Sequence, residues 1–154
     1  MRRRPRKVKR LKRLKRLKRF ETVEHTADVG VRAYGKSRAE VFANCALGMV
    51  SLMYDPESVR GSGRARIEAR APEEKALLVA WLSEILYLVE VEGWAFGEFV
   101  VDEASGTEAR GWGVGEPLDH EKHRVSGEVK APTYHMLELA ERGGRWEAQV
   151  IFDV

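Results

Sequence analysis

The sequence predicts an α+β domain in which two helices pack on a mostly antiparallel or mixed β-sheet, giving two layers. Three observations lead to this prediction. Two segments carry apolar residues at helical spacing, several shorter segments alternate between apolar and polar residues, and a length of 154 residues suits one hydrophobic core. Helices that cover one face of a sheet bury the apolar residues of both elements.

The first helix is predicted to begin after Ser37, which forms a capping-box pattern with Glu40. Its apolar stripe, which we expect to belong to the core, consists of Val41, Phe42, Cys45, Ala46, Met49, Val50 and Met53. The second helix is predicted to follow Pro72 and to end near Gly93, with large apolar residues over positions 77–89.

Strands are predicted before, between and after these helices. A strand pair bent at His25 to Asp28 begins the domain, and residues 64–71 alternate strictly between apolar and charged side chains. The remaining strand-like segments are residues 95–103, 108–114, 127–134, 136–141 and 146–152. Gly143-Gly144 suits a tight hairpin turn between the last two strands.

The first 19 residues differ sharply in composition from the rest of the chain. They contain 13 lysines and arginines and no acidic residue. The chain has 27 basic and 24 acidic residues in total, so residues 20–154 keep 14 basic and all 24 acidic side chains, a formal charge of −10. We predict a disordered basic tail over residues 1–19 and a single acidic domain over residues 20–154. The tail is either an arm that contacts RNA or a partner, or a solvated extension without a function.

Composition and spacing exclude several function classes. The single cysteine leaves no partner for an intramolecular disulfide or a zinc site. No apolar run approaches the ~20 residues of a membrane span, and no secretory segment is visible, so we expect a cytoplasmic protein that does not contact membranes. Gly111 to Gly115 is followed by Pro117 and a polar loop, not by the helix that a nucleotide phosphate requires. No serine or cysteine lies in a nucleophile-elbow context.

The four histidines are weak candidates for a metal or catalytic site. His120 and His123 have a suggestive spacing, but they follow Pro117 in a predicted loop, and the sequence fixes no third ligand. We therefore expect both to be surface histidines.

Two carboxylates near the ends of the domain are stronger candidates. Asp28 lies in the first turn, and Asp153 ends an otherwise apolar strand. If the first and last strands are neighbours, the two carboxylates, a backbone carbonyl and the terminal carboxylate form an oxygen-rich site for Ca²⁺ or Mg²⁺. In the alternative interpretation Asp28 caps a turn and Asp153 is solvated, and spacing alone favours this alternative.

A series of motifs in chain order resembles the archease family over residues 20–154. The motifs are HTADVG at 25–30, ALGM at 46–49, MYDPE at 53–57, WLSEILYL at 81–88, GEP at 115–117, EVKAPTYH at 128–135 and QVIFDV at 149–154. The resemblance implies a protein that is not an enzyme but a cofactor protein. Such a protein activates the RtcB-type tRNA-splicing RNA ligase by promoting its guanylylation and multiple turnover.

The resemblance also implies a metal site, with Asp28, Asp153 and the backbone of Val154 as ligands. The expected ion is Ca²⁺, or else Mg²⁺ or Mn²⁺, and no metal role follows for His25 or His135. The basic tail lies outside the resemblance, so RNA is contacted through the ligase or through the tail. Two alternatives stay open: an RNA-binding or chaperone-like module that acts through the tail, and a metal-dependent hydrolase, for which no general base or substrate pocket is visible.

Overall fold

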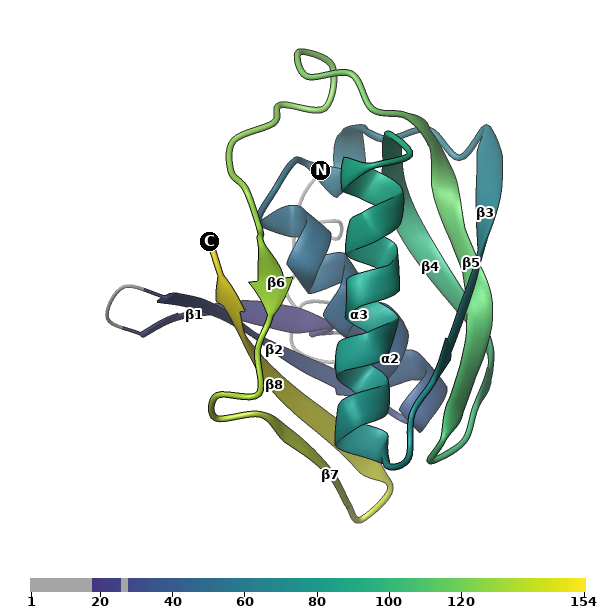
Figure 1. Cartoon of the computed structure of the whole chain (residues 1–154), viewed down its shortest axis with the longest axis vertical. Helices are drawn as coiled ribbons and strands as arrows, with labels where there is room; N and C mark the ends of the chain where they lie inside the picture. The colour runs from purple at the N-terminus through teal and green to yellow at the C-terminus, as the bar shows by residue number, and fades with distance from the viewer. Residues whose placement is uncertain (1–17, 26–27) are drawn as a thin grey trace, which may run out of the picture.

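The fold, a computed structural model that describes residues 18–25 and 28–154, contains two antiparallel sheets (Figure 1). The first sheet has the order β1-β2-β8-β6, and β7 also pairs with β8; its strands are β1 (Phe20–His25), β2 (Asp28–Gly35), β6 (Ala131–Pro132), β7 (Glu138–Arg142) and β8 (Arg145–Asp153). The second sheet has the order β3-β5-β4; its strands are β3 (Gly63–Arg70), β4 (Trp94–Ala104) and β5 (Glu108–Pro117). Residues 1–17 of the predicted tail lie outside the described part of the chain.

Two helices begin at capped N-termini. In α2 (Arg38–Ser51) the Ser37 hydroxyl accepts a hydrogen bond from the amide of Glu40 at 3.0 Å, as the capping-box pattern predicts. In α3 (Glu74–Glu90) the Glu73 carboxylate accepts hydrogen bonds from the amides of the first turn, where the helix dipole also favours a negative charge. A short 3-10 helix, η1 (Pro56–Ser58), follows α2. Neither α2 nor α3 is long and apolar enough to cross a membrane, and the described residues contain no other α-helix.

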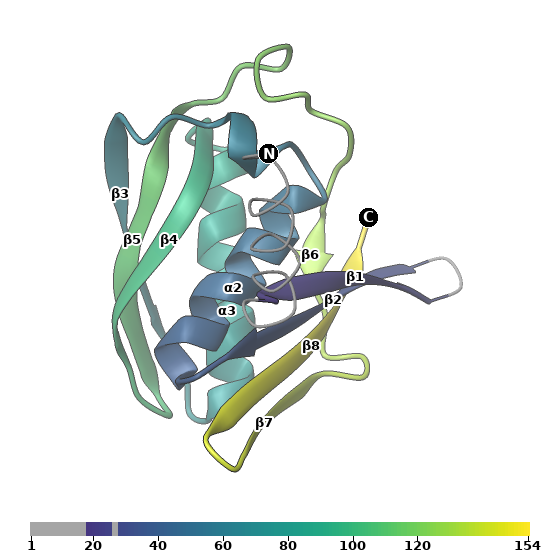
Figure 2. The same ribbon diagram turned by 180° about the vertical axis from the view of Figure 1, so that it is seen from behind.

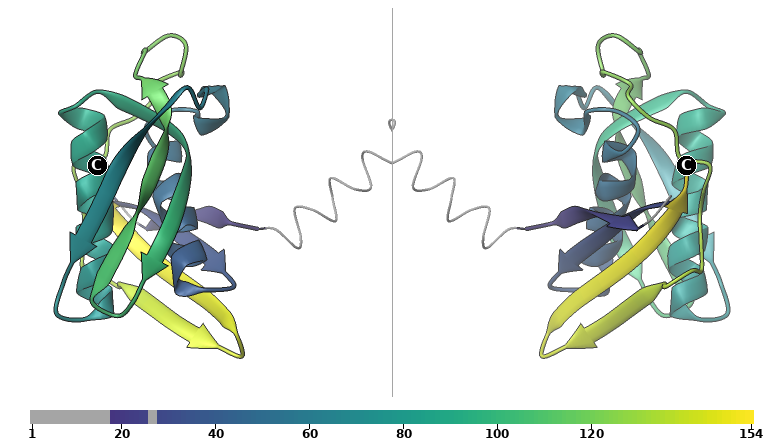
Figure 3. Two further views of the ribbon diagram at one scale, coloured as in Figure 1. Left: turned by 90° about the vertical axis from the view of Figure 1, so that its right-hand side faces the viewer. Right: turned by 90° about the vertical axis from the view of Figure 1, so that its left-hand side faces the viewer.

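The helices lie between the two sheets, because α2 contacts both β2 and β4, and α3 contacts both β3 and β6. Figure 3 shows the second sheet from its outer side on the left and the first sheet from its outer side on the right. The predicted class, two helices with antiparallel strands, is confirmed. The strands divide into two sheets, however. The two helices have apolar residues on more than one side, and one sheet covers each side of the helix pair.

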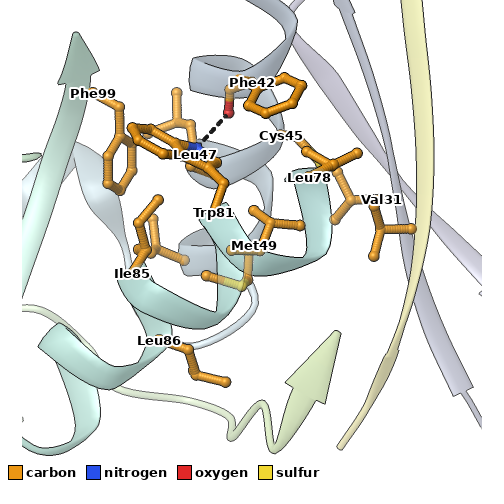
Figure 4. Packing of buried hydrophobic residues seen from close by; sticks show 14 of the residues in the cluster. Val31, Phe42, Cys45, Leu47, Met49, Leu78, Trp81, Ile85, Leu86 and Phe99 are labelled. Atoms are coloured by element: carbon orange, nitrogen blue, oxygen red, sulfur yellow. Dashed lines mark hydrogen bonds between the residues drawn. The ribbon is translucent and has the colours of Figure 1, made fainter. Parts of the chain in front are cut away.

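The core confirms the predicted apolar stripes. Trp81 of α3 is fully buried against α2, where its indole N–H donates a hydrogen bond to the carbonyl of Phe42 at 3.3 Å (Figure 4). Cys45 is also fully buried, and burial raises the pKa of its thiol to about 12. The thiol therefore stays protonated and packs as a small apolar side chain.

One predicted strand is mostly a loop. Of residues 127–134, only Ala131 and Pro132 pair with β8. Upstream, the amides of Ser126 and Gly127 donate to the carbonyl of Met53, so this part of the backbone is bonded to the end of the α2 region and not to a strand. Pro132 has no amide hydrogen, which fits the position of β6 at an edge of the first sheet.

Candidate functional site

The pairing of β2 with β8 brings the two predicted acidic ligands together. In this antiparallel register Val29 is opposite Phe152, so the next pair of positions is Asp28 and Asp153. Residues directly opposite each other on antiparallel strands have Cβ atoms about 4.5–5.5 Å apart. Figure 1 shows the C-terminal end of β8 beside β6 and the β1–β2 ribbon. The two carboxylates, distant in sequence, therefore stand on neighbouring strands at one end of the first sheet.

Both carboxylates belong to the outer face of this sheet. Val31 and Ala33 of β2 and Val150 and Phe152 of β8 are buried against the helices. Successive side chains of a strand point to opposite faces, so Asp28 and Asp153 point away from the helices. Asp153 is exposed and Asp28 is half-buried, and no basic side chain of the described residues pairs with either. Their negative charges remain available to a cation.

We call Asp28, Asp153 and Val154 the acidic corner. Strand β6 lies beside it and holds the end of β8. Ala131 pairs with Asp153, and the amide of Lys130 donates to the Asp153 carbonyl at 2.8 Å. This bond fixes the backbone immediately before Val154, whose side chain is 47% exposed. The end of β8 is thus held on both sides, by β2 and by β6.

The donors of the acidic corner suit a hard divalent cation. They are carboxylate and main-chain oxygens, which Ca²⁺, Mg²⁺ and Mn²⁺ prefer. The described residues contain no group of three or more histidine, cysteine or acidic side chains able to hold a metal. Since Ca²⁺ takes roughly six to eight oxygen ligands, the corner can supply only part of a coordination shell. It fits an open site that water or a partner molecule completes.

A second polar cluster, at the end of β5, was not predicted. His123 was expected at the surface, and this expectation is wrong: its side chain is fully buried, whereas His120 is exposed. The amide of Asp119 donates to Nδ1 of His123 at 2.9 Å, so the ring proton is on Nε2, which donates to Glu116 Oε2 at 2.7 Å. The imidazole is buried because the protein itself supplies partners for both ring nitrogens.

Glu116 is the centre of this cluster. Its carboxylate accepts hydrogen bonds from the backbone amide of Arg60 at 3.0 Å and from the Lys122 ammonium at 2.9 Å, besides the bond from His123. The Arg60 amide, followed by Lys122 and His123, lowers the pKa of Glu116 to about 2. The feature of the sequence that could have indicated this cluster is the position of an acidic residue between Gly115 and Pro117, at the end of a predicted strand. Because every partner is internal, the cluster joins a loop to the domain and leaves no open position for a ligand.

Comparison with known proteins identifies the family. The archease protein family model matches residues 20–154. The archease of Methanosarcina mazei is 41% identical over 138 residues, covering 87% of this chain and 94% of that protein. The archease of Pyrococcus furiosus is 37% identical, also over 138 residues, covering 87% and 97%.

Two solved structures share the fold. The solution structure of protein 1598 of Methanobacterium thermoautotrophicum has a TM-score of 0.73 and 34% identity, covering 88% of this chain and 98% of that one. The crystal structure of a Thermotoga maritima archease, described as a possible chaperone, has a TM-score of 0.59 and covers 87% and 96%; at 19% identity it shows the fold alone. The family model, the sequence relatives and the solved folds agree: this chain belongs to the archease family.

Proposed function

We propose that this protein is a non-enzymatic, cytoplasmic cofactor protein that activates an RtcB-type tRNA-splicing RNA ligase. It promotes guanylylation of the ligase and allows repeated turnover. The observation that carries the proposal is the pairing of Val29 with Phe152, because it makes Asp28 and Asp153, two distant residues of the resemblance, the next positions on two neighbouring strands. The reacting groups belong to the ligase, and this protein acts on them from outside.

The acidic corner is suited to act at a partner's active site. Its carboxylates lie on an outer sheet face at the end of the strands. A cation held by so few protein oxygens would keep coordination positions for a second molecule. A divalent cation, when bound, supplies positive charge that can neutralise phosphate oxygens of a nucleotide. Asp28 and Asp153 bind and orient, while Lys130 holds the Asp153 backbone in place through its amide.

Apolar side chains beside β8 offer a contact surface for such a partner. The amide and hydroxyl of Thr133 both donate to the carbonyl of Ile151, at 3.0 and 2.8 Å, and hold the loop that follows against β8. In this loop Tyr134 is 62% exposed and Met136 is 48% exposed. Met136 has a φ of 51°, a left-handed backbone conformation that is uncommon for residues other than glycine. The side-chain Nε2 of Gln149 donates a hydrogen bond to the carbonyl of Met136 at 3.0 Å. Exposed tyrosine and methionine side chains on a loop that hydrogen bonds hold in place are typical of a docking site.

Activation imposes a thermodynamic condition. A helper protein shifts the ligase toward its guanylylated form only if it binds that form, or the state leading to it, more tightly than the other forms. The corner provides a reason for such a preference, because a cation held between the two proteins interacts with nucleotide phosphates only in the nucleotide-bound states.

A multiple-turnover RNA-joining assay tests the proposal. The cognate ligase, at a concentration well below that of the RNA ends and with GTP and divalent cations, is assayed with and without this protein. We expect ligated product to exceed the amount of ligase only when the protein is present. Glu92→Gln, which removes an exposed carboxylate outside the corner, serves as the control and should activate normally. Equal product with and without the protein would contradict the proposal.

A further inference from the structure

A groove of about 1060 Å³ lies between the N-terminal half of α2 and the edge strand β4. Figure 2 shows the elements around it, with α2 between β4 and the β1–β2 ribbon. The basic residues that line the groove are Lys18, Arg19, Lys36 and Arg145, and the acidic ones are Glu40 and Glu98. Its walls therefore combine a surplus of cations with the apolar side chains of β4.

Strand register explains why these cations meet. The amide of Tyr34 donates to the carbonyl of Arg19, which places the start of β1 beside the end of β2. Gly35 is opposite Trp146, so the next pair of positions is Lys36 and Arg145. The cations thus come from the same end of three adjacent strands. Eight residue steps separate Asp28 from Lys36, so at about 3.4 Å each this basic end lies about 27 Å from the acidic corner.

The uncommitted charge in the groove is positive. Arg19 pairs with Glu98 at 2.6 Å, and Lys18 pairs with Glu21 at 2.8 Å. The Glu40 carboxylate accepts a hydrogen bond from the amide of Lys36. Among the described residues, no carboxylate pairs with the ammonium of Lys36 or the guanidinium of Arg145. Both side chains are exposed, so water solvates their charges and the phosphates of an anionic ligand can replace that water.

The residues that precede Lys18 in the sequence are also basic. Lys18 and Arg19 are the last two of the 13 basic residues in positions 1–19, so 11 of them lie in residues 1–17. Lys18 lines the groove itself. The chain therefore brings cationic residues to this wall of the groove through Lys18 and Arg19.

We propose that this groove binds the sugar–phosphate backbone of single-stranded RNA. Lys36 and Arg145 contact phosphates, and Tyr34, whose hydroxyl is fixed by a 2.5 Å hydrogen bond to Glu21, adds an aromatic wall. The volume is near the upper end for small-ligand pockets, roughly 300–1000 Å³, which suits a few nucleotides of one strand and not a duplex. A concave groove does not match a flat lipid surface. The site is separate from the acidic corner and does not depend on the ligase proposal.

RNA binding by full-length variants tests this site. The double variant Lys36→Gln/Arg145→Gln removes one lysine and one arginine from the groove. Its control, Arg60→Gln/Lys75→Gln, removes the same two residue types from exposed positions outside it. Fluorescence anisotropy with a labelled oligouridylate is measured over a range of salt concentrations, and thermal melts confirm that both variants are folded.

We expect the groove variant to bind roughly five- to tenfold more weakly than the control at low salt. Its plot of log affinity against log salt concentration should be less steep by about 1.4, because two phosphate contacts are lost. Photo-cross-linking of 4-thiouridine RNA to the wild-type protein should give cross-linked peptides that contain Lys36 or Arg145.

Three results would overturn the proposal. The first is equal affinity and salt dependence of the groove variant and its control. The second is cross-linking confined to residues 1–17, which would assign RNA binding to that segment alone. The third is that the groove variant binds RNA as well as the control does but no longer binds vesicles of anionic phosphatidylserine. This result would show that the groove binds a membrane surface and not RNA.

Discussion

The buried imidazole of His123 donates a hydrogen bond to the Glu116 carboxylate over 2.7 Å, and this contact closes the loop after β5 against the domain. The carbonyl of His123 also accepts a hydrogen bond from the amide of Asp55 at 2.8 Å, so the same residue holds the segment after α2. Three separate stretches of chain therefore depend on one histidine and one carboxylate.

The first prediction is that Glu116 makes stability depend on acid. Its pKa lies near 2 in the folded protein, below the ordinary value of 4.5. The ionised carboxylate thus stabilises the fold fully above about pH 4.5, and this contribution is lost as the pH falls toward 2. Glu116→Gln should have a lower Tm than wild type at neutral pH, and the difference should shrink in that acidic window. Glu121→Gln, on the exposed part of the same loop, should follow the wild-type Tm at every pH. A Tm difference between wild type and Glu116→Gln that stays the same at every pH would contradict this role.

The second prediction concerns the close approach of β5 to β4. A Cβ atom added at Gly115 would lie 1.8 Å from the carbonyl oxygen of Ala95, which neither backbone can accommodate without moving. Gly115→Ala should therefore destabilise the protein by about 1–3 kcal/mol or more, as overpacking does. Gly106→Ala is the control, because nothing lies within 4 Å of the added atom, and its effect should stay within about 0.5 kcal/mol. Chemical denaturation measures both, and equal stability of the two variants would show that the strands can separate at little cost.

The third prediction concerns the contact between the two helices. Trp81 is fully buried, and truncation to alanine removes its packing and leaves the Phe42 carbonyl without its donor. We expect Trp81→Ala to lower the free energy of unfolding by about 3–5 kcal/mol. Tyr87→Ala on the same helix removes a side chain that is 49% exposed and should cost far less. A loss at Trp81 no larger than the loss at Tyr87 would contradict the packing described for the core.

The fourth prediction is that the acidic corner binds a divalent cation. Binding to the folded state alone raises stability, by about 2.7 kcal/mol when the free ion is at 100 times its Kd. Ca²⁺ should therefore raise the Tm of the wild-type protein, and Asp28→Asn or Asp153→Asn should abolish the shift. The Glu92→Gln variant should retain it. Calorimetric titration with Ca²⁺, Mg²⁺ and Mn²⁺ ranks the ions, and a shift that survives in both aspartate variants would place any binding elsewhere.

Local patterns predicted the secondary structure well where neighbouring residues determine it. The spacing of Ser37 and Glu40 located the start of α2, and strict alternation over residues 64–71 located β3 to within a residue. Both Gly143 and Gly144 have positive φ, as the predicted hairpin turn requires. In these cases hydrogen bonds and side-chain periodicity within a few residues decide the conformation.

Long-range placement could not be read from the sequence in the same way. Spacing alone favoured separate roles for Asp28 and Asp153, because no local pattern indicates that β2 and β8 are neighbours. The burial of His123 was missed for a related reason: a loop has no periodicity, and its partner Glu116 belongs to a strand that precedes the loop. The division of the strands into two sheets likewise depends on long-range packing, because the side of the helix pair that a strand covers decides the sheet to which it belongs.

The most direct test of the central claim is single-turnover guanylylation of the cognate ligase, measured with radiolabelled GTP. The ligase is mixed with wild-type protein, with Asp28→Ala, with Asp153→Ala, or with Glu92→Gln as the control for loss of an exposed carboxylate. If the acidic corner activates the ligase, wild type and Glu92→Gln should accelerate label incorporation, and both aspartate variants should give the rate of the ligase alone while remaining folded. Unchanged stimulation by the two aspartate variants would contradict the claim that the protein acts through this corner.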